Sequence, residues 1–149
     1  KFSASCIVNT ANSGDNFQRF IGHQESGLRS WAANVSSGKI ELVKFTGAAQ
    51  SKASFTLNFY DSTNHLLNIW YDSVQGFRLW MDGVEIASTQ NTSGVIDLNA
   101  SGLEIGSYQG GSRTFDGVVN VPMFFDGKQL SAYDISASLA WCQDVGLLT

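Results

Sequence analysis

Four polar and aromatic side chains whose chemistry suits sugar binding recur at alternate positions in one stretch of the chain: Asn68, Trp70, Arg78 and Trp80. An indole ring can stack on the C–H face of a pyranose, while guanidinium and amide groups make directional hydrogen bonds to hydroxyls. We therefore treat these four residues as candidate ligand-binding residues for a carbohydrate.

The two segments that carry these residues are predicted to pair as a β-hairpin. Successive side chains of a strand point to opposite faces, so residues of one parity share a face. The apolar set must face the core, and its members are Ile69, Tyr71, Phe77, Leu79 and Met81. The pair Asp82-Gly83 is typical of a tight hairpin turn. The four candidate residues then share the opposite, outer face.

The outer face of this hairpin also has a structural interpretation. Aromatic residues are enriched at protein interfaces, so the same face could pack under a loop, a second sheet or a neighbouring subunit. Trp31 leaves a similar choice open, because it either reaches a binding face from another strand or lies in the core. A glycine-rich loop with Tyr108 and Arg113 is a further candidate, since loops carry specificity in such folds.

The composition restricts the class of protein. The 149 residues suit one domain (1–149), and 43% of them are hydrophobic while only 15% are charged. The net charge of −4 and the lack of any Lys/Arg run argue against nucleic-acid binding. No apolar run approaches the ~18 residues of a membrane span. The Ser, Thr, Asn and Gly content is common in extracellular and viral surface proteins, so we expect an extracellular, cell-surface or virion location.

Many short strand patterns separated by turn residues predict a sandwich or barrel. The expected strands are Phe2–Val8, Arg19–Gly22, Ser30–Val35, Lys39–Phe45, Phe55–Tyr60, Leu66–Asp72, Phe77–Met81, Val84–Ala87, Leu103–Ile105, Phe115–Val121 and Met123–Phe125. One helix is predicted after Ser131, because Ser131 and Asp134 match a capping pattern ahead of apolar residues at helical spacing. Pro122 has no backbone N–H, so a break, a bulge or a sheet edge is expected there.

Several segments, taken in order, resemble laminin-G-like domains. HLLNIWYD resembles the WHHVAVTYD strand of that family, with Asn64 where the family usually has tryptophan, and LWMDG resembles its LYVDG hairpin. LEIGSYQGGSRTFDGVVNV is similar to its LxIG…FxGxIDxV segment, and QLSAYDI to its closing LSxxEI turn and helix. Together these segments cover most of residues 64–135.

The resemblance implies an all-β fold: a two-sheet antiparallel jelly-roll sandwich of the concanavalin A-like class, with one short C-terminal helix. Members typically bind carbohydrates, so an oligo- or polysaccharide partner is expected. They occur in lectins, carbohydrate-binding modules, phage and viral attachment proteins, and some glucanases. The expected function is non-catalytic glycan binding, in a binding module or in the host-recognition domain of a phage tail fibre or viral fibre. The alternative is a structural or assembly domain that uses the same face for contacts within a homo-oligomer.

The acidic residues do not predict an enzyme. Glucanases of this fold carry an ExDxE or ExDxxE strand motif, and retaining chemistry needs two carboxyl groups about 5–5.5 Å apart. The glutamates of the chain are Glu25, Glu41, Glu85 and Glu104, and none has an acidic residue two positions away. The two histidines, His23 and His65, are interpreted as a loop residue and a partly buried structural residue.

No cofactor is expected, although many laminin-G-like domains bind calcium. The loop-adjacent acidic residues that could contribute are Asp15, Asp61, Asp72, Asp116 and Asp126. Acidic loop residues more often stabilise turns. Cys6 and Cys142 lie near opposite ends of the sequence, and they form either a disulfide that closes almost the whole chain or two buried thiols.

Overall fold

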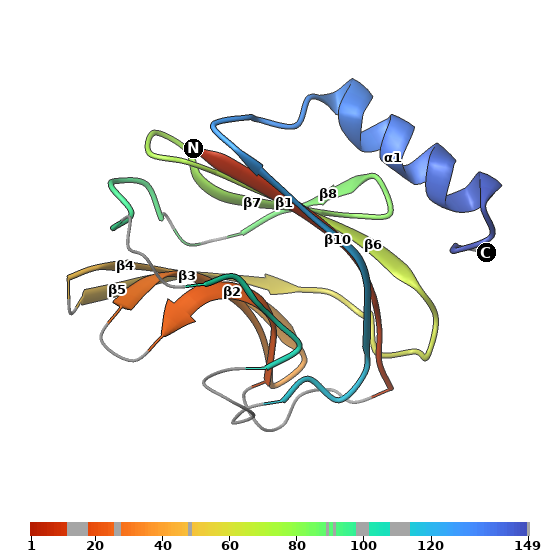
Figure 1. Ribbon diagram of the computed structural model, residues 1–149, viewed down its shortest axis with the longest axis horizontal. Helices are drawn as coiled ribbons and strands as arrows, with labels where there is room; N and C mark the ends of the chain where they lie inside the picture. The colour runs from red at the N-terminus through yellow and green to blue at the C-terminus, as the bar shows by residue number, and fades with distance from the viewer. Residues whose placement is uncertain are drawn as a thin grey trace.

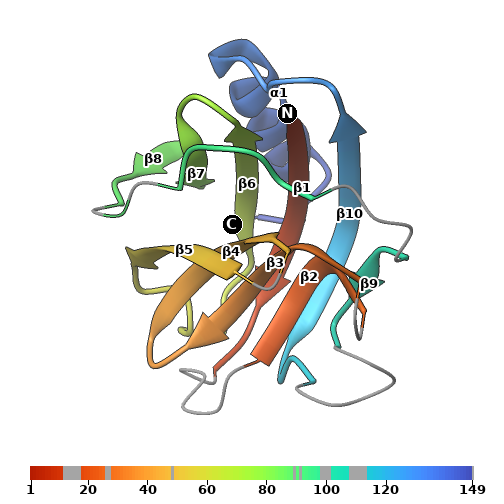
Figure 2. The same cartoon turned by 90° about the vertical axis from the view of Figure 1, so that its left-hand side faces the viewer.

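The computed structural model describes residues 1–11, 18–25, 28–47, 49–88, 90, 92–97, 102–107 and 114–148. These residues form two antiparallel sheets packed face to face, with one helix outside the first sheet (Figure 1, Figure 2). Hydrophobic side chains from both sheets fill the space between them. The predicted all-β jelly-roll sandwich with a C-terminal helix is confirmed.

The first sheet has five strands within the described residues, in the order β10-β1-β6-β7-β8. Their bounds are Phe2–Asn9 (β1), His65–Asp72 (β6), Gly76–Met81 (β7), Val84–Ile86 (β8) and Val118–Asp126 (β10). Seven successive residues of β1 are buried. Continuous burial shows that β1 is covered on both faces, by the second sheet on one side and by the helix and the segment before it on the other.

The second sheet, again counted over the described residues, has the order β5-β4-β3-β2-β9. Its strands are Gln18–Glu25 (β2), Leu28–Ser36 (β3), Lys39–Thr46 (β4), Ala49–Thr56 (β5) and Glu104–Ile105 (β9). The strand predicted at Phe55–Tyr60 was placed wrongly, because β5 ends at Thr56. The first four residues of β5 are exposed and lack the apolar alternation that marks a strand, as is usual for a polar sheet edge.

The β6–β7 hairpin has the predicted register. Trp70 pairs with Arg78, and Asn68 pairs with Trp80. The side chains expected in the core are buried or packed against it. Asp82 and Gly83 form the turn to β8 with φ angles of 51° and 80°, which is the left-handed conformation that a tight hairpin requires.

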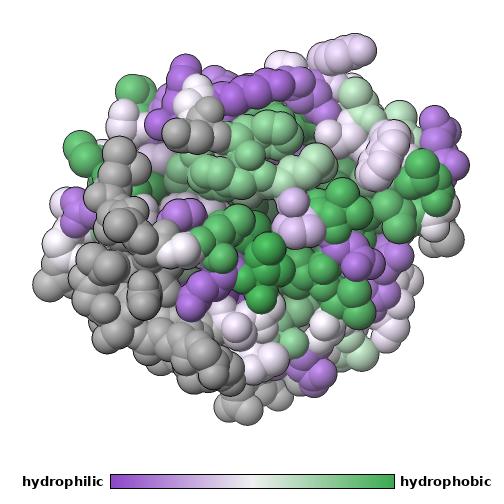
Figure 3. Space-filling model, viewed as in Figure 1, coloured by the Kyte–Doolittle hydropathy of each residue, from purple (hydrophilic) through white to green (hydrophobic). Residues whose placement is uncertain are grey.

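Strand β10 lies at the edge of the first sheet, as the single proline indicated. The register between β1 and β10 shifts between Ser5 and Ile7, opposite Pro122, and Val121 adopts a φ of 47°. The two strands predicted around Pro122 are therefore one bulged strand. Green hydrophobic side chains gather across the middle of the face in Figure 3, where Figure 1 shows β10 and the segment that contains β9.

Helix α1 (Ala132–Asp144) begins at the predicted cap. The Ser131 Oγ accepts a hydrogen bond from the Asp134 N–H, and the Asp134 carboxylate accepts one from the Ser131 N–H. This capping box satisfies backbone donors that the first helical turn leaves unpaired. Helix α1 is too short to cross a bilayer, and the described residues contain no longer helix.

The two cysteines lie on opposite sides of the first sheet. Cys6 points into the core between the sheets, whereas Cys142 on α1 packs with Ile7 and Leu66 on the outer face. Both thiols are therefore free and buried, so the interpretation without a disulfide holds.

Candidate functional site

The outer face of the hairpin is largely covered, which changes the expectation for two of the predicted site residues. Asn68 and Trp70 are exposed by only 0% and 1%. Asn68 Oδ1 accepts a hydrogen bond from Ser5 Oγ on the adjacent strand. The expectation that all four candidate residues lie on an open face is therefore wrong for this pair.

The segment between β10 and α1 lies over the outer face beside Trp70, and α1 itself packs over β6. Ser3 is the cross-strand neighbour of Trp70, and its hydroxyl donates to the Lys128 carbonyl and accepts from the Leu130 N–H. The chain therefore passes over the outer face of β1 before α1 begins. Local periodicity gave the correct face for Trp70 but carried no information about what lies over that face.

Arg78 and Trp80 remain half-buried, at the rim of the covered area. The Arg78 guanidinium lies 4.9 Å from the Trp80 ring centroid and 5.3 Å from the Trp70 ring centroid. Its Nε and one terminal nitrogen donate to the Glu85 carboxylate over 2.6 and 2.5 Å. Arg78 thus already has a bidentate acid partner, and of the two indoles only that of Trp80 is accessible. Tyr108 and Arg113, the other predicted ligand-binding residues, lie outside the described residues.

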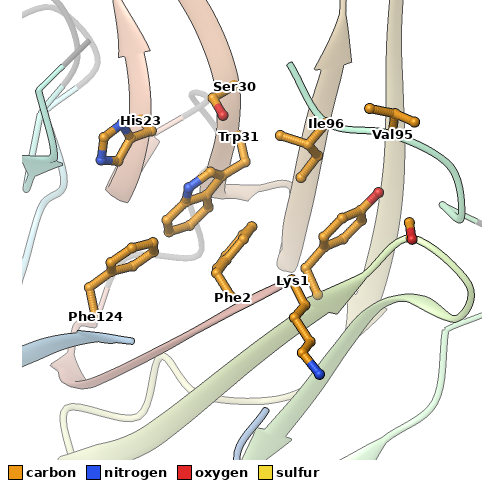
Figure 4. A pocket seen from close by; sticks show the side chains of 10 residues that line it. Lys1, Phe2, His23, Ser30, Trp31, Val95, Ile96 and Phe124 are labelled. Carbon is orange, nitrogen blue, oxygen red and sulfur yellow. The ribbon is translucent and has the colours of Figure 1, made fainter. Parts of the chain in front are cut away.

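A different set of residues forms an open cleft at one end of the sandwich, between the two sheets. The cleft has a volume of about 430 Å³. Its lining residues come from both sheets and from the segment after β8, and they are Lys1, Phe2, His23, Ser30, Trp31, Tyr71, Ser73, Val95, Ile96 and Phe124 (Figure 4). A cleft of this size falls within the range of small-molecule sites.

Aromatic rings form much of the cleft wall. Phe2 stacks on Trp31 with 4.6 Å between the ring centroids, and Phe124 lies parallel to Trp31 within 10° at 6.0 Å. Tyr71 also stacks on Phe2, with 5.7 Å between the ring centroids. Phe124 is the accessible member, with 37% of its surface exposed, whereas Trp31 is exposed by 2%. Trp31, whose position the sequence left open, is therefore a core residue that also lines the cleft.

Polar groups lie among these rings. His23, which lies in β2 and not in a loop as expected, is 6.0 Å from the Phe124 ring, and Ser30 and Ser73 also line the cleft. Burial lowers the pKa of His23, which favours the neutral imidazole at neutral pH. A neutral imidazole offers one donor and one acceptor, as a sugar hydroxyl does.

A buried lysine holds the wall that Val95 and Ile96 supply. The Lys44 ammonium donates hydrogen bonds to the carbonyls of Ser93 and Val95 over 2.5 and 3.4 Å. The Tyr71 hydroxyl donates to the Gly94 carbonyl in the same segment. Burial lowers the pKa of Lys44. These contacts tie the segment after β8 to both sheets and so fix one side of the cleft.

Sequence reasoning missed this cleft because its residues share no local motif. Phe2, His23 and Phe124 come from three strands that are distant in the sequence, and the two phenylalanines have the pattern of ordinary core residues. The only available signal was that the residues lie near the ends of their strands, which becomes meaningful once the strand order is known.

A second polar cluster surrounds His65, which is half-buried as predicted. Its Nδ1 lies 2.7 Å from Asp82 Oδ2, and its Nε2 lies 3.1 Å from Asp61 Oδ1. Burial alone lowers the pKa of His65, but the hydrogen bonds and charges of the two carboxylates outweigh it, so the pKa is raised. Hydrogen bonds from the Thr63 hydroxyl and N–H lower the pKa of Asp61 to about 2.

The acidic residues proposed as calcium ligands do not converge within the described residues, which contain no group of three His, Cys, Asp or Glu side chains that could hold a metal. Asp61 is hydrogen-bonded to Thr63, and Asp72 accepts the backbone N–H groups of Val74 and Gln75. Both therefore stabilise turns. Asp15 and the side chain of Asp126 lie outside the described residues.

The protein family that the sequence matches has the fold that the structure shows. Residues 1–136 match the family described as the concanavalin A-like lectin/glucanases superfamily, in its laminin-G form. The chain therefore belongs to this family. Among curated proteins, no sequence relative matches the chain.

Solved structures with the same fold come from toxins and from laminin. The receptor-binding domain of botulinum neurotoxin C/D mosaic serotype is similar with a TM-score of 0.74 and 14% identity, over 94% of this chain and 36% of that chain. Domains LG4-5 of the mouse laminin alpha1 chain have a TM-score of 0.67 and 15% identity, over 89% and 37%. This chain thus spans little more than a third of the chains that it matches.

Proposed function

We propose that this domain binds a carbohydrate in the aromatic cleft and catalyses no reaction. The cleft itself is the observation that carries the proposal: about 430 Å³ of open volume with aromatic walls and a few polar groups. Carbohydrate sites combine these two features, because a sugar ring has apolar C–H faces and hydroxyls at its edge. Family membership and the absence of a paired-carboxylate motif from the sequence support the same proposal.

In this proposal Phe124 provides the stacking surface. It is the most accessible of the clustered rings, and it lies next to His23, whose neutral imidazole can donate to one hydroxyl and accept from another. Trp31 and Phe2 lie behind it and hold it in place, since their own faces are already in contact. Preorganised rings lose little side-chain entropy when a ligand binds.

The biological setting belongs to the same proposal. One similar solved structure is of botulinum neurotoxin type C, whose cell entry depends on interaction with two ganglioside molecules, and another is the binding domain of botulinum neurotoxin DC in complex with SialylT. We infer an extracellular, cell-surface or virion role with a saccharide partner, in a binding module or in the receptor-binding part of a phage or viral fibre. Sequencing of the parent polypeptide tests this setting, because a fibrous repeat favours the fibre and a catalytic domain favours the module.

A matched pair of variants tests the site. Phe124→Ala should weaken binding to glycans identified on a glycan array by about tenfold, because the stacking surface is lost. Phe125→Ala removes the same side chain from the opposite face of the same strand and should leave glycan affinity unchanged. Equal affinities for the two variants, with circular dichroism showing both folded, would rule out the cleft.

Two further measurements test the alternatives. Trp80→Ala tests the predicted binding surface around Trp80 and Arg78. If Trp80→Ala loses glycan binding and Phe124→Ala does not, the binding site lies on the β6–β7 hairpin. The assembly alternative predicts a stable homo-oligomer with a Trp80 that aqueous quenchers cannot reach. Size-exclusion chromatography with light scattering, together with fluorescence quenching of a Trp141→Phe variant that lacks the exposed indole of α1, separates it from a monomeric glycan-binding domain.

A further inference from the structure

The free edge of β10 carries backbone groups that are positioned to pair with another strand. The Gly127 N–H donates to the Lys1 carbonyl, and this bond fixes which alternate residues of β10 hydrogen-bond to β1. The backbones of Phe125 and Met123 therefore face β1, because hydrogen-bonded pairs alternate in an antiparallel ladder. The N–H and C=O groups of Phe124 and Asp126 face the open side, and no described residue pairs with them.

An apolar groove runs beside this edge, between β10 and α1. Its volume is about 410 Å³, and it is lined by Val121, Met123, Phe125, Lys128, Leu130, Asp134, Ala137, Ser138 and Trp141. Trp141 is exposed by 49%. Val118, Val121 and Phe124 are further exposed apolar residues along β10. Exposed apolar surface of this kind marks interaction sites.

Of the two charged groups that line the groove, Lys128 and Asp134, the lysine is the one that an acidic neighbour could contact. The Lys128 ammonium lies 3.0 Å from Asp134, but the Asp134 carboxylate also accepts hydrogen bonds from the N–H and hydroxyl of Ser131. Asp134 would therefore keep its capping partners if Lys128 turned away. Half of the Lys128 side chain is exposed, and an exposed ion pair of this type is weak. An incoming carboxylate could therefore pair with the Lys128 ammonium at little cost in free energy.

We propose that β10 and α1 form a docking site for an extended peptide strand, with apolar side chains at alternate positions and an acidic residue near Lys128. The peptide backbone pairs with Phe124 and Asp126, in the manner of β-strand addition. Alternate peptide side chains then point to the same side as Met123 and Phe125 and enter the groove against Trp141. Pro122 and the bulge at Val121 confine the pairing to the end of β10 after Pro122.

An array of eight-residue peptides tests this site on the intact chain. The peptides alternate apolar residues with threonine, and each is made with either aspartate or lysine at one end. The aspartate forms should bind preferentially, and Trp141→Ala should weaken binding by about tenfold. Lys128→Gln should remove the preference for aspartate. Tyr133→Ala is the control, because this residue lies on the same helix with 79% of its surface exposed and does not line the groove.

Backbone readouts distinguish strand addition from simple apolar contact. Bound peptide should slow hydrogen exchange at the N–H groups of Phe124 and Asp126. Of two peptides that are N-methylated on alternate residues, one at the odd positions and one at the even positions, only the one whose methylated groups face β10 should lose binding. The proposal is overturned if no peptide in the array binds, or if the two alternately N-methylated peptides bind equally well. It is also overturned if the Phe124 and Asp126 amides become protected from hydrogen exchange when the protein concentration alone is raised. The last result would identify a second copy of the chain as the occupant.

Discussion

The two faces of the first sheet carry similar aromatic residues and differ in what lies over them. On the inner face, Phe2, Tyr71 and Phe124 reach the end of the sandwich, where the sheets leave a cleft. On the outer face, Trp70 is buried next to the segment that leads from β10 to α1, with the Arg78 guanidinium over its ring. Side-chain chemistry thus defines what a face could bind, while the path of distant parts of the chain decides whether that face is open.

The largest expected effect concerns the two tryptophans of the hairpin. Trp70→Ala should lower the free energy of unfolding by about 3–5 kcal/mol, because it empties a fully buried site. Trp80→Ala, at the half-buried rim, should cost about 1 kcal/mol. Urea denaturation monitored by circular dichroism measures both. Similar losses in the free energy of unfolding for the two variants would contradict the burial of Trp70 on the outer face.

A smaller effect should follow from weakening the helix cap. Ser131→Ala removes the capping hydroxyl and should destabilise α1 by about 1 kcal/mol. If α1 opens locally, Cys142 becomes accessible, and its labelling by a thiol reagent should accelerate about fivefold. Cys6 lies on the other side of the sheet, where burial raises its pKa to about 12, so its labelling should not change. Equal acceleration of both cysteines would show that the sheet and helix open together.

The smallest expected effect is a dependence of stability on pH through His65. Its pKa is raised in the folded protein, so its contribution is fully present below the unfolded pKa of about 6.5 and is lost as pH rises through the folded value. Thermal unfolding between pH 5.5 and 8.5 should therefore show wild type losing more stability than His65→Gln as pH rises. Parallel curves would mean that the contacts with Asp61 and Asp82 do not favour the charged imidazole.

The sequence predicted most of the fold because its signals are local. The register of β6 and β7 follows from alternating apolar residues, and the helix start follows from Ser131 and Asp134. Strand β5 was misplaced because its exposed first half, before Ala53 and Phe55, has no apolar alternation. Pro122 predicted an edge or a bulge, and both are present.

The candidate site was less predictable for a physical reason. The cover over the outer face beside Trp70 comes from a segment 58 or more residues further along the chain, around Lys128 and Leu130, and from α1 after it. The cleft depends on strand order, which brings Phe2 and Phe124 together from opposite ends of the chain. Neither relation leaves a pattern within a window of neighbouring residues.

The pairing of β1 with both β6 and β10 has a consequence for how the protein is made. Strand β1 is synthesised first, but β10 begins at Val118. At about 5–20 residues per second, the edge of β1 that β10 will cover waits several seconds or more for its partner. A fold dominated by such distant pairings is also expected to fold slowly, in milliseconds to seconds. During that interval an apolar strand with an unpaired edge is the part of the nascent chain that most needs protection from aggregation.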